Sequence, residues 1–486
     1  MIDKRSTVLL ALGTLLATGC EVGPKYVKPS ALPSPPAFRE PLPSNATNSS
    51  DWKTATPMDQ VDRGKWWVIF GDAQLNDFED QLTQANHNLQ LAEARLRQAR
   101  AAIRFNRASQ FPSISFSPSI LNERDSGNQP YFNQSLVNNG TGNFIFPLEL
   151  SYEVDLWGRI RRSVTAAKEE AQSSAGDVEA AKLSLHAELA RDYFGLRSAD
   201  LQEWLLQDTV KTYERALKIT EDRYNGGAAP RADVEQARTQ LQSAQVLETD
   251  IVQVRANYEH AIAVLVGNTP AHFSIAPDKD FVLRPPQIPV GVAGTLLERR
   301  PDVAAAERRV AAANEQIGIA KAAYFPQVTI GAAAGFQSAQ ASNWFSWPSR
   351  LWAVGPSVSQ VIYDGGRRRA VSEGARANYD ATVAIYRQDS LTAFQEVEDN
   401  LVALNVLAKE VEQQRSATAS AERALDLFTK RYQDGVDTYL QVVTSQTTAL
   451  SNESNDIDLR RRQMDASVLL IKAVGGGWDR SQLPSF

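Results

Sequence analysis

The feature that most constrains this chain is the length of its segments without glycine or proline. Neither residue occurs from Asp72 to Phe111, from Arg231 to Val266 or from Ala375 to Asp434. These segments are rich in Ala, Leu, Gln, Glu and Arg, and apolar residues recur at a spacing of seven, as at Leu89 and Leu96. Such composition and spacing are typical of coiled-coil helices. The sequence therefore predicts several long helices.

Two of the predicted helices are longer than a membrane is thick. Residues 163–222 and 375–434 have 60 residues each, which corresponds to about 90 Å at roughly 1.5 Å per residue. A whole bilayer measures about 40–45 Å. Apart from residues 8–18, no segment approaches the roughly 18 continuous apolar residues that a spanning helix needs. If the chain crosses a membrane, it must do so as a β-barrel.

Segments with a period of two lie between the predicted helices. From Phe144 to Leu156 every second residue is apolar, whereas Glu149, Ser151 and Glu153 fall on the opposite face. Aromatic residues gather at the ends of these segments, as they do at the interfaces of membrane barrels. A soluble sandwich is the alternative, but two strands inserted between long helices have no second sheet to pack against. We expect strands at about 113–124, 143–157, 326–337 and 351–363.

Charge and composition argue against several classes of function. With 51 basic and 57 acidic residues the net charge is −6, which leaves no basic excess for nucleic acid. One cysteine and four histidines exclude a Cys/His metal cluster and a disulfide framework. His186 and Glu188 fall on different faces of a helix, and Gly475–Gly477 lacks the lysine of a phosphate loop. We therefore expect neither an enzyme nor a cofactor or metal site.

The amino terminus resembles a bacterial lipoprotein signal. Lys4 and Arg5 precede an apolar run, and the small residues Ala17–Gly19 precede Cys20, which is the only cysteine. We expect residues 1–19 to be a signal peptide and Cys20 to be acylated; an ordinary signal peptide beside a chance cysteine is the alternative. Glu21 follows the cysteine, so the aspartate that holds bacterial lipoproteins at the inner membrane is absent, and by resemblance the expected address is the outer membrane. We expect the proline-rich segment 20–70 to form an extended arm.

The chain contains two related halves. At an offset of 214 residues, Phe111-Pro112 matches Phe325-Pro326. At an offset of 208, Gly158-Arg159 matches Gly366-Arg367. An internal duplication is the simplest explanation. The expected division is repeat 1 at 71–270, a linker at 271–298, repeat 2 at 299–474 and a tail at 475–486, with helices 231–266 and 437–474 after the long ones.

Several motifs together resemble one protein family, the TolC-like outer membrane efflux proteins, and within it the lipoprotein branch that serves resistance-nodulation-division (RND) pumps. They are Gly23-Pro24-Lys25-Tyr26 behind the signal, Asp155-Leu156-Trp157-Gly158-Arg159, Tyr363-Asp364-Gly365-Gly366-Arg367, the Gln395–Glu398 run, and two Arg-Tyr pairs. The resemblance covers essentially the whole chain.

The resemblance implies an α+β membrane protein. A homotrimer would form one 12-stranded β-barrel from four strands per protomer, continued by an α-helical coiled-coil barrel through the periplasm. The residues agree, because four strands cannot close a barrel alone and their edges must pair with other chains. The expected location is the outer membrane of a Gram-negative bacterium, with a lipid anchor at Cys20 and contact with outer membrane lipid.

The implied function is export of drugs or other toxic compounds, with a periplasmic adaptor and an inner-membrane RND pump as partners. A channel for type I protein secretion or for metal efflux is the alternative within the family. Outside it, a periplasmic adaptor would lack the amphipathic strands, and a passive porin would not need helices of about 90 Å.

We place a gate at the periplasmic ends of the helices. Arg223-Tyr224 and Arg431-Tyr432 each precede a glycine, Gly227 or Gly435, that suits a left-handed helix cap. Charge-assisted hydrogen bonds from these pairs would link neighbouring coils; solvated tip residues are the alternative. The family often has an aspartate where Thr444 stands, so a cation-attracting ring is in doubt there. One polar helix face is expected to comprise Asp437, Gln441 and Thr444.

Overall fold

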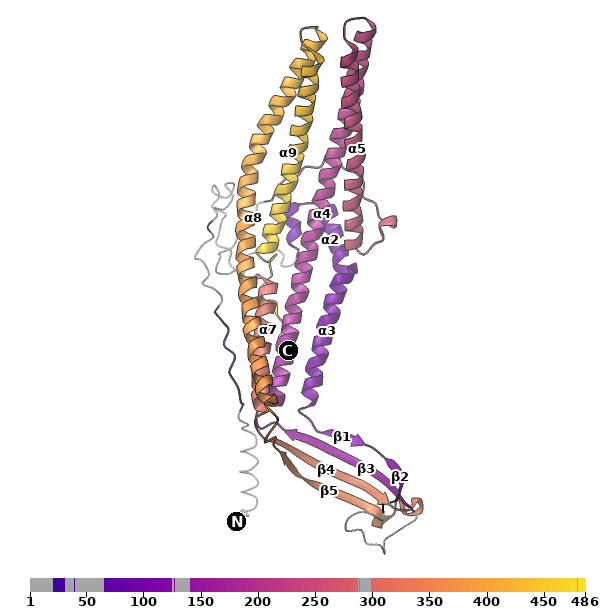
Figure 1. Ribbon diagram of the computed structural model, residues 1–486, viewed down its shortest axis with the longest axis vertical. Helices are drawn as coiled ribbons and strands as arrows, with labels where there is room; N and C mark the ends of the chain where they lie inside the picture. The colour runs from indigo at the N-terminus through magenta and orange to yellow at the C-terminus, as the bar shows by residue number, and fades with distance from the viewer. Residues whose placement is uncertain are drawn as a thin grey trace.

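The molecule is elongated, with helices along its long axis and one antiparallel sheet at one end (Figure 1). This computed structural model describes residues 21–30, 39, 65–124, 126, 140–286, 288, 299–478 and 480–486. The signal peptide, Cys20 and most of the proline-rich segment lie outside the described residues. Within them, helices and strands follow one another in the predicted order.

Four helices form two antiparallel hairpins, and corresponding helices have equal lengths. The longer helix of each hairpin has 67 residues and the shorter one has 35. The hairpins are α4 (Arg159–Asn225) with α5 (Arg231–Leu265), and α8 (Arg367–Gln433) with α9 (Tyr439–Ala473). Among the described residues, no helix combines the length and the apolar character that crossing a membrane requires.

Both long helices begin earlier than predicted, at 159 rather than 163 and at 367 rather than 375. A glycine with positive φ precedes each of them, Gly158 at 78° and Gly366 at 91°. Asp155 accepts hydrogen bonds from two backbone N–H groups of the first turn of α4, at 2.8 and 3.1 Å. Asp364 accepts two at the start of α8, at 3.1 and 3.2 Å. These carboxylates satisfy N–H groups that a helix start leaves unpaired.

The single helix expected between residues 72 and 111 is instead two helices, α2 (Ala73–Ala85) and α3 (His87–Ala108). Asn86 separates them in an extended conformation. Its side chain accepts hydrogen bonds from two backbone N–H groups of α3, at 2.9 and 3.0 Å, and its amide donates to the Leu265 carbonyl at 2.8 Å. The break therefore comes from side-chain capping, which a search for glycine and proline does not detect.

The helix of the second half that corresponds to α3 is α7 (Pro301–Ala322), and Arg300 before it is extended, as Asn86 is before α3. Arg300 precedes it and donates to the Ala473 carbonyl at 3.3 Å. Arg300 is 214 residues beyond Asn86, and Ala473 is 208 beyond Leu265. The two halves therefore make the same contact between the start of one helix and the end of another.

The helices pack in a regular order. Near the sheet, α3, α4, α7 and α8 are successive neighbours. Toward the other end, α5 packs on α4 and α9 packs on α8, and α9 also contacts α4. The two hairpin turns consequently lie side by side at the end farthest from the sheet (Figure 1).

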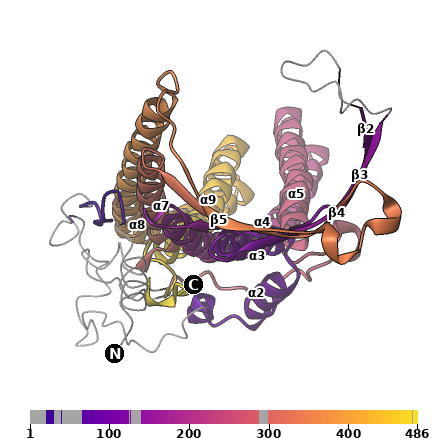
Figure 2. The ribbon, with the colours of Figure 1, turned by 90° about the horizontal axis from the view of Figure 1, so that it is seen from below.

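The sheet has the order β1-β3-β4-β5, with β2 paired to a different part of β3. The strand expected at 113–124 is divided at Ser117-Pro118, because proline has no N–H for the ladder. The last strand ends at 359 rather than 363. Seen along the long axis, the sheet is curved (Figure 2). Its strands are β1 (Ser113–Phe116), β2 (Ser119–Glu123), β3 (Thr141–Val154), β4 (Gln327–Ser338) and β5 (Arg350–Ser359).

The pairing register separates an apolar face from a face of small and polar residues, as the alternation predicts. Leu150 lies opposite Ile114 on one side and Ala332 on the other. The next residue, Ser151, lies opposite Ser113 and Gly331. Since side chains alternate along a strand, the first set shares one face of the sheet and the second set shares the other. The apolar face also carries Phe146, Leu148, Val328, Ile330, Phe336, Trp352, Val354 and Val358.

A buried histidine–glutamate pair joins α2 to α4 in the middle of the molecule. Glu79 is 0% exposed and His186 is 2% exposed. His186 Nδ1 lies 2.5 Å from Glu79 Oε2, and the Trp67 ring stacks on the imidazole at 4.3 Å. Burial lowers the pKa of His186 to about 3 and raises the pKa of Glu79 well above its usual value. Burial therefore favours the uncharged form of both residues.

Candidate functional site at the helical tips

The two hairpin turns are built alike. Gly227 and Gly435 have φ of 75° and 76°, which only glycine adopts without strain. Beyond each glycine, a backbone N–H donates to the carbonyl of an arginine, at 2.8 Å for Arg223 and 2.9 Å for Arg431. This six-residue closure satisfies carbonyls at the helix end. The predicted tip residues are thus brought to one end of the molecule by the same motif.

Arg223 and Tyr432 connect the two hairpins within one chain. The Arg223 guanidinium carbon lies 4.8 Å from the centroid of the Tyr432 ring, and Nη1 donates to the Gln433 carbonyl at 2.8 Å. Tyr432 is 5% exposed and packs against Tyr439, with ring centroids 5.1 Å apart. The Tyr432 hydroxyl donates to Asp233 on α5 at 3.5 Å. A cation–π contact and hydrogen bonds therefore hold the tips together.

The other Arg-Tyr combination is arranged differently. Tyr224 is 43% exposed, whereas the equivalent Tyr432 is buried. Arg431 forms an ion pair with Asp437 at 2.5 Å within its own turn. This hydrogen-bonded partner keeps the pKa of Asp437 below its usual value, so the carboxylate stays ionised at neutral pH. The sequence predicts two equivalent pairs, but within a single chain one residue of each pair, Arg223 and Tyr432, bridges the hairpins.

The remaining predicted tip residues lie along α9 and beside its start. Gln441 and Thr444 are exposed, and Asp437 is partly exposed. The Thr444 hydroxyl donates to the Leu440 carbonyl one turn earlier at 2.9 Å, so its hydrogen is already used within the helix. Asp437 is the carboxylate of this group. In the part of the chain that the structure describes, no group of three or more His, Cys, Asp or Glu side chains is arranged to hold a metal.

Comparison with known proteins places this architecture in one family. The family model described as outer membrane efflux protein matches residues 79–268 and 292–476. The chain belongs to the outer membrane efflux protein family. The matched ranges include the whole of both hairpins and the strands before them.

Relatives of this family match nearly the full chain. Outer membrane protein OprJ of Pseudomonas aeruginosa is 30% identical over 480 residues, which are 98% of this chain and 96% of OprJ. The toluene efflux pump outer membrane protein TtgC of Pseudomonas putida is 30% identical over 483 residues, with 98% and 96% covered. The pyoverdine export outer membrane protein OpmQ of Pseudomonas aeruginosa is 30% identical over 444 residues, with 90% and 93% covered.

Solved efflux channels have the same fold. The outer-membrane channel OprN matches with a TM-score of 0.84 and 28% identity, covering 94% of this chain and all of that one. The Campylobacter jejuni CmeC channel matches with a TM-score of 0.85 and 24% identity, covering 95% and 96%. The likeness to CmeC concerns the fold alone.

Two residues of this family member's tip escaped the sequence analysis, Asp233 and Tyr439. Asp233 accepts the Tyr432 hydroxyl, and partial burial raises its pKa. Tyr439 is 2% exposed and lies against Tyr432. From the sequence alone, Asp233 cannot be distinguished from any other acidic residue in the first turn of a helix. Only the approach of the two hairpins at their tips gives it a tyrosine partner.

Proposed function

We propose that this chain is the outer-membrane channel of a tripartite efflux system, and that it conducts drugs or other toxic compounds outward from a periplasmic adaptor and an inner-membrane RND pump. The observation that carries the proposal is a full-length likeness to efflux pump outer membrane proteins, together with helices of 67 residues beside a sheet with one apolar face. A deletion strain should become more susceptible to exported compounds, and the intact gene should restore resistance. Unchanged susceptibility to a broad panel would contradict the proposal.

The functional unit we infer is a homotrimer with a 12-stranded barrel. In one chain β1 and β5 are edge strands, and all ten residues of β5 are exposed or half-exposed, with no further strand beside them in the described structure. Unpaired edges favour pairing with other chains, and three copies supply enough strands for closure. Native mass measurement in mild detergent should give a trimer.

We further infer that the two halves arose by duplication. A side chain at Gly267 would place its Cβ 2.8 Å from the Ala85 carbonyl oxygen, and one at Gly475 would place it 2.0 Å from the Arg299 oxygen. The glycines are 208 residues apart, and the carbonyls are 214 residues apart. The same close approach at both sequence offsets supports a common origin.

The gate we propose combines contacts within and between protomers. In a ring in which the two hairpins alternate, Arg431 of one protomer would contact Tyr224 of the next, as Arg223 contacts Tyr432 within a chain. Tyr432→Phe with Asp437→Ala removes the hydroxyl bond to Asp233 and releases Arg431. Single-channel conductance in planar bilayers should rise, while trimer stability changes little because these are tip contacts.

Thr447→Ala is the matched control for the gate, since Thr447 is outside the predicted gate and its exposed hydroxyl donates to the Val443 carbonyl within its own helix at 3.0 Å. Its conductance should equal that of the wild type. The proposal fails if the double variant also conducts like the wild type, because the tip residues would then be merely solvated.

The anchor we propose is an acyl group on Cys20. Glu21, the next residue, is held against the start of α4, where its carboxylate pairs with Arg162 at 3.4 Å. Labelled palmitate should enter the wild-type protein and be absent from Cys20→Ser. Equal labelling of the two proteins would exclude lipidation at this residue. Insertion of the strands should persist, because their apolar face is independent of the lipid.

A further inference from the structure

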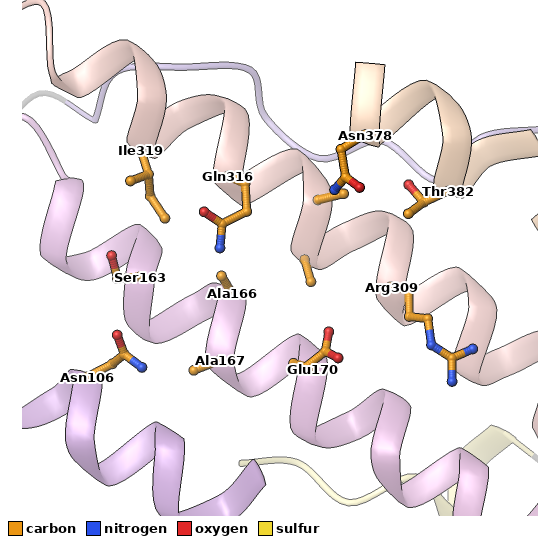
Figure 3. Close-up of a pocket in the computed structure, with 12 residues that line it drawn as sticks. Asn106, Ser163, Ala166, Ala167, Glu170, Arg309, Gln316, Ile319, Asn378 and Thr382 are labelled. Carbon is orange, nitrogen blue, oxygen red and sulfur yellow. The ribbon is translucent and has the colours of Figure 1, made fainter. Parts of the chain in front are cut away.

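A groove of about 470 Å³ lies over the contact between α4 and α7, on the half of the molecule near the sheet. Helix α3 contributes Asn106 to one side of it, and α8 contributes Asn378 and Thr382 to the other. Figure 3 shows Gln316 of α7 and Glu170 of α4 directed into the space between these two helices. Four helices that are distant in sequence thus line one cavity.

The floor of the groove is apolar and its rim is polar. Ala166, Ala312 and Ala313 line it and are 5%, 8% and 4% exposed. Because alanine ends at Cβ, these residues let α4 and α7 pack closely and leave a smooth apolar surface above the contact. Amide groups stand around this surface on α3, α7 and α8. A mostly apolar cavity with a few converging polar groups is the usual form of a small-molecule site.

The groove carries one uncompensated negative charge. Arg309 lines it, but this guanidinium is paired with Asp177 at 2.5 Å. Among the residues that the structure describes, no lysine, arginine or histidine nitrogen lies within 4.0 Å of the Glu170 carboxylate. Glu170 is exposed, so its charge faces the solvent in the groove. The cavity therefore favours a cationic ligand over an anionic one.

The groove opens on the side of the helices away from the amino-terminal segment. That segment contacts α7 where Gly23 approaches Gly318 and where the Tyr26 hydroxyl donates to Glu307. Along α7, Gln316 is nine residues from Glu307 and two from Gly318. At roughly 100° per residue, these spacings turn Gln316 by about 180° and 200° around the helix axis, so it lies on the opposite face of α7 from both residues. Because the segment leads to the lipid-anchor position, it occupies the outer surface. The groove then faces the interior of the proposed channel.

We propose that this groove is a transit site for amphipathic organic cations inside the channel. The inference rests on the proposed function, since a lumen exists only in the trimer. The apolar body of the ligand lies on the alanine floor, its cationic centre faces Glu170, and the amides accept or donate hydrogen bonds. A site on a conduction path must bind weakly enough to release its ligand, which suits an open groove with one exposed carboxylate.

The test uses two probes of similar size and opposite charge, tetraphenylphosphonium and tetraphenylborate, on trimers in planar bilayers. Tetraphenylphosphonium should reduce the potassium chloride conductance of the wild type, and tetraphenylborate should not. Glu170→Gln should raise the half-blocking concentration of the cation by about fivefold, as expected for one exposed charge pair. Glu170→Asp should retain the block.

Glu373→Gln is the matched control. It removes one carboxylate from α8, five residues before Asn378 and about 140° around the helix from it, where Glu373 pairs with Arg369 at 2.9 Å. This variant should be blocked like the wild type. Equal block of Glu170→Gln and wild type, or equal block by both probes, would overturn the proposal.

Binding measured without conduction separates this proposal from the proposed function. Equilibrium dialysis of tetraphenylphosphonium against trimers in lipid nanodiscs should show the same loss for Glu170→Gln and none for Glu373→Gln. Specific binding in protein that does not conduct would refute the channel and leave the groove. Normal conductance with no Glu170-dependent binding would refute the groove and leave the channel.

Discussion

Leu150→Arg is expected to remove most of the assembled trimer. Leu150 lies in the middle of the apolar face, between Ile114 on β1 and Ala332 on β4. In the proposed barrel this face contacts lipid, where an arginine at the bilayer midplane costs about 2–4 kcal/mol. Each trimer carries the substitution three times. Trimer that resists dissociation in outer membrane fractions should therefore fall strongly.

Ser151→Arg is the control, because Ser151 follows Leu150 directly but points to the other face, with Ser113 and Gly331 as neighbours. An arginine there enters the aqueous interior and should leave far more trimer. Equal loss in both variants would mean that any arginine in β3 disrupts the sheet. A greater loss for Ser151→Arg would mean that the two faces are assigned the wrong way round.

The helices and the alternating strands were predictable because each depends on a periodic local pattern. The periodic pattern did not predict where these helices and strands end or are interrupted. Asn86 divides a predicted helix by capping the next one, although it is neither glycine nor proline. Pro118 divides a predicted strand although the apolar alternation continues past it. Apolar residues also follow Ser359, at Val361 and Ile362, but the described strand ends at Ser359. Periodicity reports which side chains would share a face, and hydrogen-bond partners decide whether the element forms.

The tips show a second limit of the sequence. Two Arg-Tyr pairs at matching positions suggest equal roles, yet Tyr432 is buried between the hairpins and Tyr224 is 43% exposed. Their difference arises from the way the hairpins pack, because Tyr432 of the second hairpin and Arg223 of the first face the contact between them, whereas Tyr224 does not. No pattern in the sequence marks Glu170 as a residue of a binding groove, since it is one of many glutamates on a long helix. Its place in a groove depends on α7, which follows it by more than a hundred residues.

Glu79→Ala is expected to lower the free energy of unfolding by about 1–3 kcal/mol, the range for leaving a buried polar group without its hydrogen-bond partner. The substitution removes the hydrogen-bond partner of His186 Nδ1 and opens a cavity beside Trp67. Glu79→Gln keeps the size of the side chain, and its amide can hydrogen-bond to Nδ1, so it should lose much less. Thermal unfolding of the purified protein in detergent would rank the three proteins.

The pH dependence of that ranking tests the protonation of the pair. Glu79 has a pKa raised above its usual value of 4.5, so its proton stabilises the fold fully below pH 4.5 and progressively less as the pH rises toward the folded pKa. Glu79→Gln lacks this titration. The advantage of the wild type over Glu79→Gln should therefore shrink above pH 4.5, by about 1.4 kcal/mol per pH unit at most. If Glu79 were ionised beside a charged His186, its pKa would instead be lowered in the fold, and the wild-type advantage would grow only until about pH 4.5 and then level off. A wild-type advantage that falls just above pH 4.5 therefore indicates a neutral pair, which the 0% exposure of Glu79 favours, whereas a level one indicates an ion pair.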